Sequence, residues 1–485
     1  MSYHDVPEGG AAREIGRKIY MDALAGRRGF RDDQIGIDDP ELWAEIFEAM
    51  GRIALTELTT EYVEALGVAA ARVLGGGRWL LGRDTRESGP ALQAALARGL
   101  SAGGADPGDC GVLPTPALAH CSATAQLPGA MITASHNPYT DNGVKIFAPG
   151  GLKLSDDVER QIEEQLEAQL AERGAARTSS QPVSHETGDR TDSVLQYIEH
   201  IVAMFPPGVL SGLRVVLDCA NGAMSVAAPQ AVRALGADVI VINAAPNGTN
   251  INAACGATHP AALSIAVLAE GADAGLAFDG DGDRVIAIDG TGATVDGDRL
   301  IALGALQLRA EGALTDNAVV VTVMSNLGFH HAMRDAGIDV VTTAVGDRYV
   351  LEALDAGGYA IGGEQSGHVI YRHVATTGDG LLAGLKLLQR LQATGSTLAE
   401  LAGGVMTTYP QVLVNVRVAD RHPRIADELA PEIAAVQGEL GDDGRVLLRP
   451  SGTEPLVRVM VEAASDEHAH ALATQLADAV RARYA

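Results

Sequence analysis

The stretch LRVVLD at residues 213–218 predicts a short buried strand, because it is an apolar run that ends at a polar loop. A helical pattern follows that loop, and the same order of segments occurs three times in the chain. In the first block the strand is 79–81, the loop 82–84 and the helix 90–100. In the second block the strand is 213–218, the loop 221–222 and the helix runs to 235. In the third block the strand is 318–323, the loop 325–326 and the helix runs to 336. Strands that alternate with helices are typical of parallel sheets, so the sequence predicts tandem α/β blocks of one design.

The C-terminal part of the chain has a different pattern, which predicts an α+β module. The expected elements are a half-buried strand at 411–418, a helix near 425–440, a strand at 445–449 and a last helix from Glu467. A chain of 485 residues is too long for one hydrophobic core, so several domains are expected. The polar stretch 172–193 predicts the link between the first two blocks, and 290–296 a turn into the third.

Composition excludes several classes of protein. Apolar residues make up 47% of the chain and charged residues 20%, which is typical of a folded globular protein. A run of about 18 apolar residues is absent from the sequence, so we expect no membrane span. The start of the chain lacks the apolar stretch of a secretory signal, which favours the cytoplasm. The net charge of −26 makes nucleic acid a poor partner, although local basic clusters can still bind anionic substrates.

The four cysteines carry no metal or disulfide signature. They are scattered through the chain without CxxC spacing. We therefore expect buried free thiols.

The sequence DGDGDR at residues 279–284 is the strongest chemical signal. Its carboxylates, Asp279, Asp281 and Asp283, alternate with glycines that let the backbone turn tightly. Three hard oxygen donors in a short loop suit Mg²⁺. A calcium-binding EF-hand loop does not fit, because Arg284 replaces the required glycine and Gly290 the required glutamate. The alternative is a plain turn rich in aspartate and glycine.

The sequence TASHNP at residues 133–138 predicts a loop after a strand at 130–132. Ser135, with His136 beside it and Lys145 within reach of the loop, is a candidate activated nucleophile. The GxSxG elbow of acyl-transfer enzymes does not surround this serine. The alternative is a turn held by local hydrogen bonds.

Two further loops have the composition of ligand-binding segments. The sequence RPSGTEP at 449–455 combines an arginine, two hydroxyl groups and a glycine turn, which suits a phosphate, and Arg458 adds a charge. In the sequence GEQSGH at 363–368, Glu364 and Ser366 can hydrogen-bond sugar hydroxyls, although this signal alone is weak. The chain has no Gly-Lys dipeptide and so no Walker A loop, which argues against a P-loop kinase.

In this order the four loops resemble those of the α-D-phosphohexomutase superfamily, and most closely its phosphoglucosamine mutase branch. The resemblance runs from about residue 56 to the C-terminus. The other matching stretches are 82–89, 217–222, 250–252, 258–260, 323–328 and 345–350.

The resemblance implies four domains around a central cleft, of which three are related α/β domains and the last is α+β. Each domain contributes one of the four loops. The expected bounds are 1–46 for an atypical N-terminal extension, 47–190, 191–292 and 293–402 for the α/β domains, and 403–485 for the α+β domain.

The resemblance also implies roles for individual residues. Ser135 is expected to be a phosphoserine that holds Mg²⁺ together with the three aspartates. Lys145, with His136 or Arg284, is expected to assist proton transfer and neutralise charge. Substrate binding is assigned to Arg86, to Glu364 and Ser366, which read the sugar hydroxyls, and to Arg449, Ser451, Gly452, Thr453 and Arg458, which hold the phosphate that is not reacting.

The implied reaction interconverts hexosamine 6-phosphate and 1-phosphate. Ser135 donates its phosphate to glucosamine 6-phosphate, and the resulting 1,6-bisphosphate turns over and returns its other phosphate to the serine. A sugar 1,6-bisphosphate is the expected activator. The expected partner is a small sugar phosphate, and the expected assembly a monomer or homodimer.

The N-terminal region departs from the family pattern. The family begins almost at once with an FGTxGxRG loop, whereas residues 47–54 here are FEAMGRIA, with Ile53 where the family has its arginine. Arg52 lies one place away, and Arg27 or Arg28 could substitute. A weakened phosphate contact favours a sugar-phosphate phosphatase as an alternative to the family's reaction. A mutase for another sugar phosphate in a specialised pathway is a third possibility. A non-enzymatic sensor is disfavoured, because Ser135 and the three aspartates are present.

Overall fold

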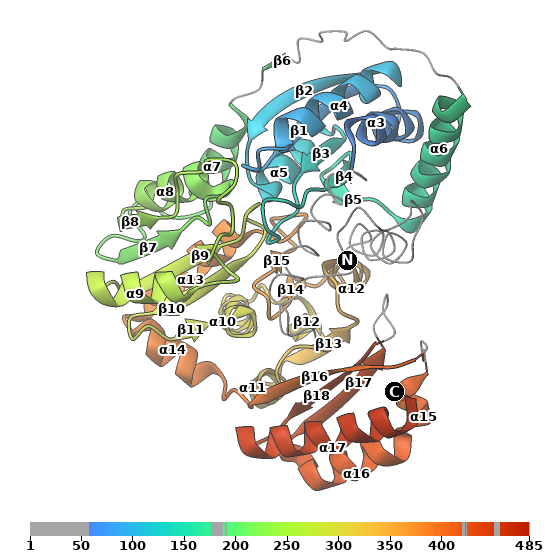
Figure 1. The fold of residues 1–485 in the computed structure, drawn as a ribbon. Helices are drawn as coiled ribbons and strands as arrows, with labels where there is room; N and C mark the ends of the chain where they lie inside the picture. Colours follow the sequence, from blue (N-terminus) through green and yellow to red (C-terminus); the bar gives the residue numbers. More distant parts are fainter. Residues whose placement is uncertain are drawn as a thin grey trace, which may run out of the picture. The chain divides into compact units, whose positions relative to one another are not determined.

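The computed structural model describes residues 58–175, 188–189, 192–419, 422, 424–450 and 456–484 (Figure 1). These residues form two compact units. The larger unit contains the described residues up to 324 together with 336–405, and the smaller contains 325–335 and the described residues from 406 onward. Three sheets lie in the larger unit and one in the smaller.

The first sheet has the strand order β5-β4-β3-β1-β2-β6. Its parallel centre carries the predicted strand at 79–81, and the predicted helix at 90–100 is α4; both predictions are confirmed. The strands are β1 (Gly77–Arg83), β2 (Ala105–Val112), β3 (Gly129–Ile132), β4 (Val144–Ala148), β5 (Leu152–Lys153) and β6 (Gly188–Asp189), and the helices are α3 (Thr60–Leu74), α4 (Gly89–Ala102), α5 (Thr115–Ala125) and α6 (Asp156–Ala175). Trp79 and Leu81 pack with α4 residues such as Leu96, because alternate residues of a strand point to the same face.

The expected link at 172–193 is partly ordered into this domain. Helix α6 continues to Ala175, and β6 adds a parallel strand at the edge of the sheet beside β2. Residues 176–187 lie outside the described part of the chain.

The second sheet has the order β11-β10-β9-β7-β8, and it includes the predicted strand at 213–218. Its elements are β7 (Arg214–Asp218), β8 (Asp238–Ile242), β9 (Ala274–Phe278), β10 (Val285–Asp289) and β11 (Thr294–Val295), with helices α7 (Ser193–Ala203), α8 (Met224–Ala234) and α9 (Ala261–Glu270). The segment 290–296, predicted as a turn into the third block, is followed directly by α10 (Gly297–Ala310), but it also contains the short strand β11. Residues 290–293 form a hairpin turn inside the second sheet, because β11 pairs with β10.

The third sheet has the order β13-β12-β14-β15. Its strands are β12 (Ala318–Thr322), β13 (Asp339–Thr343), β14 (Ile361–Gly363) and β15 (Val369–Tyr371), and its helices are α10 (Gly297–Ala310), α12 (Asp347–Gly357), α13 (Gly380–Thr394) and α14 (Leu398–Val405), with a 3₁₀ turn η3 (Thr315–Asn317). The predicted strand at 318–323 is confirmed by β12.

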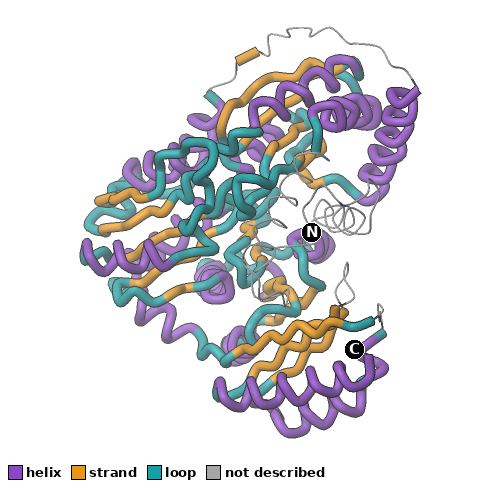
Figure 2. Tube along the Cα trace, in the orientation of Figure 1, coloured by secondary structure: helices purple, strands orange, loops and turns teal. Residues whose placement is uncertain are grey.

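The three sheets share one design, in which an antiparallel strand follows a parallel strand. In each sheet this pair is joined by one of the loops singled out in the sequence. The pairs that close the loops are Ile132 with Val144, Phe278 with Val285, and Gly363 with Val369. The serine, aspartate and glutamate loops therefore occupy the same position in three related sheets, and Figure 2 shows these connections as loop segments between strands.

The smaller unit contains an antiparallel sheet with the order β16-β18-β17. Its elements are α11 (Leu327–Asp335), β16 (Gln411–Arg417), α15 (Ile425–Glu428), α16 (Ala430–Leu440), η4 (Gly441–Asp443), β17 (Arg445–Pro450), β18 (Leu456–Glu462) and α17 (Asp466–Tyr484). The single helix expected near 425–440 is two helices, because the backbone leaves the helical range at Leu429 and Pro431 starts a new first turn. The central strand β18 was not predicted. The helix expected before residue 336 is confirmed by α11, which groups with the smaller unit.

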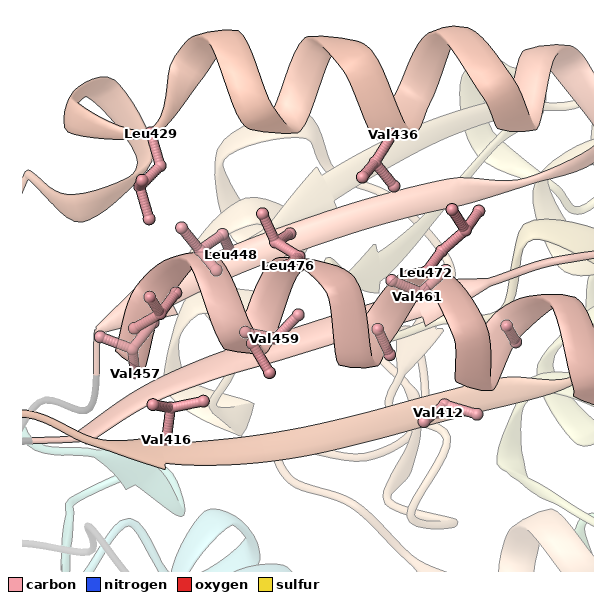
Figure 3. Packing of buried hydrophobic residues seen from close by; sticks show 14 of the residues in the cluster. Val412, Val416, Leu429, Val436, Leu448, Val457, Val459, Val461, Leu472 and Leu476 are labelled. Carbon is pink, nitrogen blue, oxygen red and sulfur yellow. The ribbon is translucent and has the colours of Figure 1, made fainter. Parts of the chain in front are cut away.

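One face of this sheet packs against its helices and forms the core of the unit. Val457, Val459 and Val461 alternate along β18 and lie against Leu472 and Leu476 of α17 (Figure 3). The residues between them, including Arg458, therefore point to the opposite face. The predicted α+β module is confirmed, and the opposite face of its sheet carries Arg449 and Arg458.

Candidate active site

The candidate nucleophile lies in a strained loop after β3. Ser135 has a φ of +51°, a conformation that residues other than glycine seldom adopt. Its N–H donates to Thr133 Oγ1 at 2.9 Å, and Asn252 Nδ2 donates to the carbonyl oxygens of Ser135 and Asn137 at 2.8 and 3.0 Å. These bonds fix the loop on both sides of the serine, so the surrounding structure sets its backbone conformation.

Arg86, which was predicted to bind substrate, supports this loop in the structure. The residue is 1% exposed, and its Nε donates to Asp84 Oδ2 at 2.8 Å. Its remaining nitrogens donate to backbone carbonyl oxygens of the serine loop, namely those of Ser135, Asn137, Pro138 and Asp141. A guanidinium that is buried and fully engaged in this way cannot bind a substrate phosphate.

The aspartate loop between β9 and β10 could hold a metal ion. One carboxylate oxygen from each of Asp279, Asp281 and Asp283 lies within 4.8 Å of the others, and all three residues are buried. Asp281 Oδ1 and Asp283 Oδ1 are buried and accept no hydrogen bond from the described residues. Buried carboxylate oxygens without a donor are costly, so this donor set fits a divalent cation that prefers oxygen ligands.

The serine and aspartate loops meet at atomic distance. Ser135 Oγ donates to Asp279 Oδ2 at 2.6 Å. This approach requires Gly280, because a Cβ at that position would lie 2.5 Å from the carbonyl oxygen of Ser135. The nucleophile and the candidate metal site, 144 residues apart in the chain, therefore form one site.

A lysine partly neutralises the aspartates. Lys145 Nζ donates to Asp281 Oδ2 at 2.7 Å and to Asp283 Oδ2 at 3.0 Å. Burial alone would lower the pKa of Lys145, but these two carboxylates outweigh it and raise the pKa. The lysine therefore stays charged, and Thr115 Oγ1 adds a hydrogen bond to Asp281 Oδ2 at 2.6 Å.

The three aspartates differ in their protonation. Burial raises the pKa of Asp279 well above its usual range, and the neighbouring carboxylates of Asp283 and Asp281 raise it further. Burial acts in the same direction on Asp283, but Lys145 and then His368 outweigh it and hold its pKa well below the usual range. Lys145 and the more distant Arg284 supply too little positive charge for three buried carboxylates, and a bound cation would supply the rest.

Two further residues predicted as catalytic lie at this site. His136 Nδ1 is 3.5 Å from Ser135 Oγ, and burial lowers the pKa of His136 to about 4. The imidazole is therefore neutral near pH 7 and can accept a proton. Arg284 donates its backbone N–H to Asp279 Oδ1 at 3.1 Å, and its Nε lies 4.0 Å from Asp283 Oδ1.

The sugar-recognition loop adds residues that the sequence did not assign. Glu364 Oε1 accepts from the backbone N–H of Gly346 at 3.0 Å, and Ser366 Oγ lies 3.5 Å from Glu364 Oε2. In the same loop, the ring of His368 is nearly buried, with Nδ1 3.7 Å from Asp283 Oδ1 and Nε2 3.7 Å from Asp347 Oδ2. The third domain therefore approaches the aspartate loop through His368.

Asp347 also pairs with the first domain, because Lys153 Nζ donates to Asp347 Oδ2. Sequence reasoning missed Thr115, His368, Asp347 and Lys153. His368 and Asp347 lie in the quoted stretches 363–368 and 345–350, which is the only signal that could have found them. Their role becomes visible only when three domains are placed together.

In the smaller unit, Arg449 and Arg458 face each other across β17 and β18. Burial lowers the pKa of Arg449, and the charge of Arg458 lowers it further. The Nε of Arg458 is buried without a hydrogen-bond partner in the described part of the chain. Two adjacent guanidinium groups of this kind favour an anion. Ser451, Gly452 and Thr453 lie outside the described residues, as do Arg27, Arg28 and the stretch 47–54.

Models of the four domains of phosphoglucomutase/phosphomannomutase match the chain. The α/β/α domains I, II and III match residues 48–173, 195–292 and 296–409, and the C-terminal domain matches 413–479. The chain belongs to the phosphoglucomutase/phosphomannomutase family. This result confirms both the predicted superfamily and the predicted fold class.

Two relatives show which members of the phosphoglucomutase/phosphomannomutase family are similar to the chain. The phosphoglucosamine mutase of Frankia casuarinae is 52% identical over 446 residues, which cover 88% of the chain and 96% of the relative. The phosphoglucosamine mutase of Parafrankia sp. is 51% identical over 476 residues, which cover 95% of the chain and 99% of the relative.

Solved structures of the phosphoglucomutase/phosphomannomutase family have the same fold. A family protein from Burkholderia thailandensis matches with a TM-score of 0.71 and 25% identity, over 87% of the chain and 94% of that protein. The Aspergillus fumigatus N-acetylphosphoglucosamine mutase, in complex with GlcNAc-6P and magnesium, matches with a TM-score of 0.61 over 98% and 99% of the two chains. Its 20% identity supports the fold alone.

Membrane insertion has no support in the described helices, none of which combines the length and apolar character needed to cross a bilayer.

Proposed function

We propose that the protein is a phosphoglucosamine mutase that interconverts glucosamine 6-phosphate and glucosamine 1-phosphate through a phosphorylated Ser135. The observation that carries this proposal is the 2.6 Å contact between Ser135 Oγ and Asp279 Oδ2 inside a buried carboxylate cluster. The names of relatives that are 51–52% identical support the choice of substrate.

The three aspartates would hold the magnesium ion. The fit rests on the undonated oxygens of Asp281 and Asp283 and on an all-oxygen donor set. When bound, the ion would supply charge stabilisation to the phosphoryl oxygens. Lys145 would remain protonated and neutralise charge beside it, because its carboxylate partners raise its pKa.

In the proposed reaction, the phosphoryl group moves from Ser135 to the sugar phosphate. A hydroxyl oxygen of the sugar phosphate forms a bond to phosphorus while the bond from phosphorus to Ser135 Oγ breaks. The neutral His136 would accept the proton of that hydroxyl and would then return a proton to Ser135 Oγ, which lies 3.5 Å from its Nδ1. The product is the 1,6-bisphosphate, and the reverse reaction at its other phosphate reloads Ser135. Added bisphosphate would act as activator by phosphorylating an empty serine.

The substrate would be held away from the reacting centre by two groups of residues. Glu364 and Ser366 would bind the sugar hydroxyls. Arg449 and Arg458, with Ser451, Gly452 and Thr453, would hold the phosphate that is not reacting. The cationic pair across β17 and β18 supports this assignment.

We further propose a cytoplasmic enzyme that acts as a monomer or homodimer. Four buried free cysteines support a reducing compartment.

³¹P NMR tests the proposal directly. The purified protein is incubated with Mg²⁺ and glucosamine 6-phosphate, with and without glucose 1,6-bisphosphate. We expect the resonance of the 1-phosphate, and stimulation by the bisphosphate. Inorganic phosphate as the main product would contradict the mutase proposal and show that the protein is a phosphatase. Unchanged spectra with every hexose phosphate would contradict any catalytic role and leave only a protein that binds sugar phosphates.

A pair of serine variants tests the nucleophile. Ser135→Ala should abolish turnover, because it removes the oxygen that carries the phosphate. Ser264→Ala is the matched control, since this serine lies in α9 and its hydroxyl donates to the carbonyl oxygen of Gly292 in the turn between β10 and β11. Wild-type turnover in Ser135→Ala would refute the phosphoserine mechanism.

A further inference from the structure

The proposed substrate differs from glucose 6-phosphate at one group, the amino group at C2, which is an ammonium when protonated. A protein selects such a group by presenting a carboxylate that a neutral hydroxyl satisfies less well. The metal-loop aspartates are engaged by Ser135, Thr115 and Lys145, and the oxygens that accept no hydrogen bond, Asp281 Oδ1 and Asp283 Oδ1, are those assigned to the cation. Glu364 is assigned to the sugar hydroxyls, and each of its carboxylate oxygens already lies next to a donor of its own domain.

Asp347 is the acidic residue at the site with an available oxygen. Its Oδ2 accepts from Lys153, whereas its Oδ1 accepts no hydrogen bond from the residues that the structure describes. The side chain is 33% exposed. Burial alone would raise the pKa of Asp347, but Lys153 and then His368 outweigh it and lower the pKa to about 2. The carboxylate is therefore negative at any pH at which the enzyme is assayed.

Its position places Asp347 beside the groups that read the sugar. The preceding residue, Gly346, donates its N–H to Glu364 at 3.0 Å. On its other side, Asp347 Oδ2 lies 3.7 Å from His368 Nε2, and His368 Nδ1 lies 3.7 Å from Asp283. Asp347 thus lies one imidazole ring away from the metal loop, next to the carboxylate assigned to the sugar hydroxyls.

The structure also shows that this carboxylate accepts an ammonium group. Lys153 reaches it from the first domain and occupies one of its two oxygens. A second ammonium could bind at Oδ1, because the negative charge is shared by both oxygens. The bond from Lys153 would hold the carboxylate in position for it.

We infer that Asp347 binds the C2 ammonium of the substrate and thereby selects hexosamine phosphates over hexose phosphates. This inference rests on the proposed function, because it assumes that the site binds a sugar phosphate. It assigns Asp347 a direct contact with substrate, in contrast to a purely positioning role toward His368.

The test compares two substrates in Asp347→Asn, which keeps the size of the side chain and removes its charge. We expect kcat/KM for glucosamine 6-phosphate to fall about 10- to 100-fold, which corresponds to the loss of a charge-assisted hydrogen bond. The value for glucose 6-phosphate should change less than about threefold. An equal fall for both substrates would overturn the inference in favour of a positioning role, and unchanged values for both would overturn it as well.

Two control variants separate the remaining explanations. Asp355→Asn removes a carboxylate from the same helix, where it pairs with Arg372 at the surface, and should leave the ratio of the two substrates unchanged. Lys153→Met breaks the ion pair between the domains but leaves the carboxylate of Asp347. It should retain the preference for the amino sugar. Loss of the preference in Lys153→Met would show that the ion pair, and not substrate contact, accounts for the effect.

Calorimetric binding of the two sugar phosphates separates failure of this inference from failure of the proposed function. If wild type binds glucosamine 6-phosphate without converting it, the mutase proposal fails, and a selective loss of affinity in Asp347→Asn still supports the inference. If wild type binds neither sugar phosphate, both fail. Equal affinities of wild type for the two sugars would overturn the inference alone.

Discussion

The aspartate loop of the larger unit and the arginine pair of the smaller unit hold like charges together in opposite ways. Three carboxylates, those of Asp279, Asp281 and Asp283, lie together with Lys145 as their close cationic partner and Arg284 farther away. Arg449 and Arg458 place two guanidinium groups opposite each other on neighbouring strands. Folding alone gains nothing from either arrangement, since like charges repel and burial disfavours charge. A ligand of the opposite sign would relieve the repulsion in each region, and the proposed ligands, a cation in the first and a phosphate in the second, have that sign.

The largest effect is expected where the acidic region is broken. Asp279→Asn removes one carboxylate from the cluster and the acceptor of the Ser135 hydroxyl, so activity should fall about a thousandfold. The same change relieves repulsion, because burial and the neighbouring carboxylates raise the pKa of Asp279. The metal-free variant should therefore melt at a temperature no lower than metal-free wild type. Steady-state kinetics and thermal melting in EDTA check both parts, and a marked loss of stability would contradict the comparison.

Asp379 is a buried carboxylate outside both regions, and none of the described cationic side chains contributes to the shift in its pKa. It therefore shows what burial does to a carboxylate without a cationic partner. Asp379 caps α13 and accepts from Tyr197 Oη at 2.8 Å, and burial raises its pKa from 3.8 to about 6. Since the folded protein holds this proton more tightly than the unfolded chain, stability from this group is present below pH 4 and is lost as the pH rises through 6. The free energy of unfolding of wild type, minus that of Asp379→Asn, should fall by about 3 kcal/mol from pH 4 to pH 7.

Chemical denaturation across this pH range measures the difference. Asp106→Asn, at an exposed position, is the control and should leave the profile unchanged. Tyr197→Phe removes a hydrogen bond that favours the ionised carboxylate, so its profile should fall more steeply. A difference between wild type and Asp379→Asn that does not vary with pH would contradict the assignment.

Metal addition tests the acidic region without mutation. A divalent cation that binds only the folded protein should stabilise it by about 2.7 kcal/mol when its concentration is 100 times its Kd. Melting in MgCl₂ and in EDTA measures this shift in wild type and in Arg458→Met. The two proteins should respond alike, because the arginine belongs to the anion region. A metal response that disappears in Arg458→Met would show that the two regions are not independent.

The smallest effect is expected in the cationic region. Arg458→Met removes one phosphate-binding charge but also removes the repulsion that lowers the pKa of Arg449. These changes oppose each other, so KM for the sugar phosphate should rise only about tenfold with little change in stability. Arg481→Met, which removes a surface arginine paired with Asp478, is the control and should leave KM unchanged.

The parts of the fold that depend on local pattern could be predicted from sequence. The apolar run before Asp218 and the serine and aspartate loops lie where expected, because strand length and glycine turns are encoded locally. Strand β18 was missed, although it is the centre of its sheet. Arg458 and Glu462 interrupt its apolar residues, and only pairing with strands on both sides makes it regular.

The site was predictable to the extent that its residues lie in recognisable loops. Ser135 and the three aspartates were found, and the structure brings them together. The role of Arg86 could not be predicted, because its partners are backbone carbonyl oxygens about 50 residues away and carry no sequence signature. The same holds for His368 and Asp347, whose meaning depends on contacts with the other two α/β domains.

The shared position of the three loops has a consequence for engineering. Each loop is flanked by the same kind of paired strands, so it can be exchanged without changing the strands themselves. The paired residues that bound the loops are Ile132 and Val144, Phe278 and Val285, and Gly363 and Val369. Exchanging the segment between one such pair for that of another mutase would alter chemistry or sugar preference while leaving the rest of the sheet in register. The chain can therefore serve as a scaffold for chimeric enzymes in which the serine loop, the aspartate loop and the glutamate loop are varied one at a time.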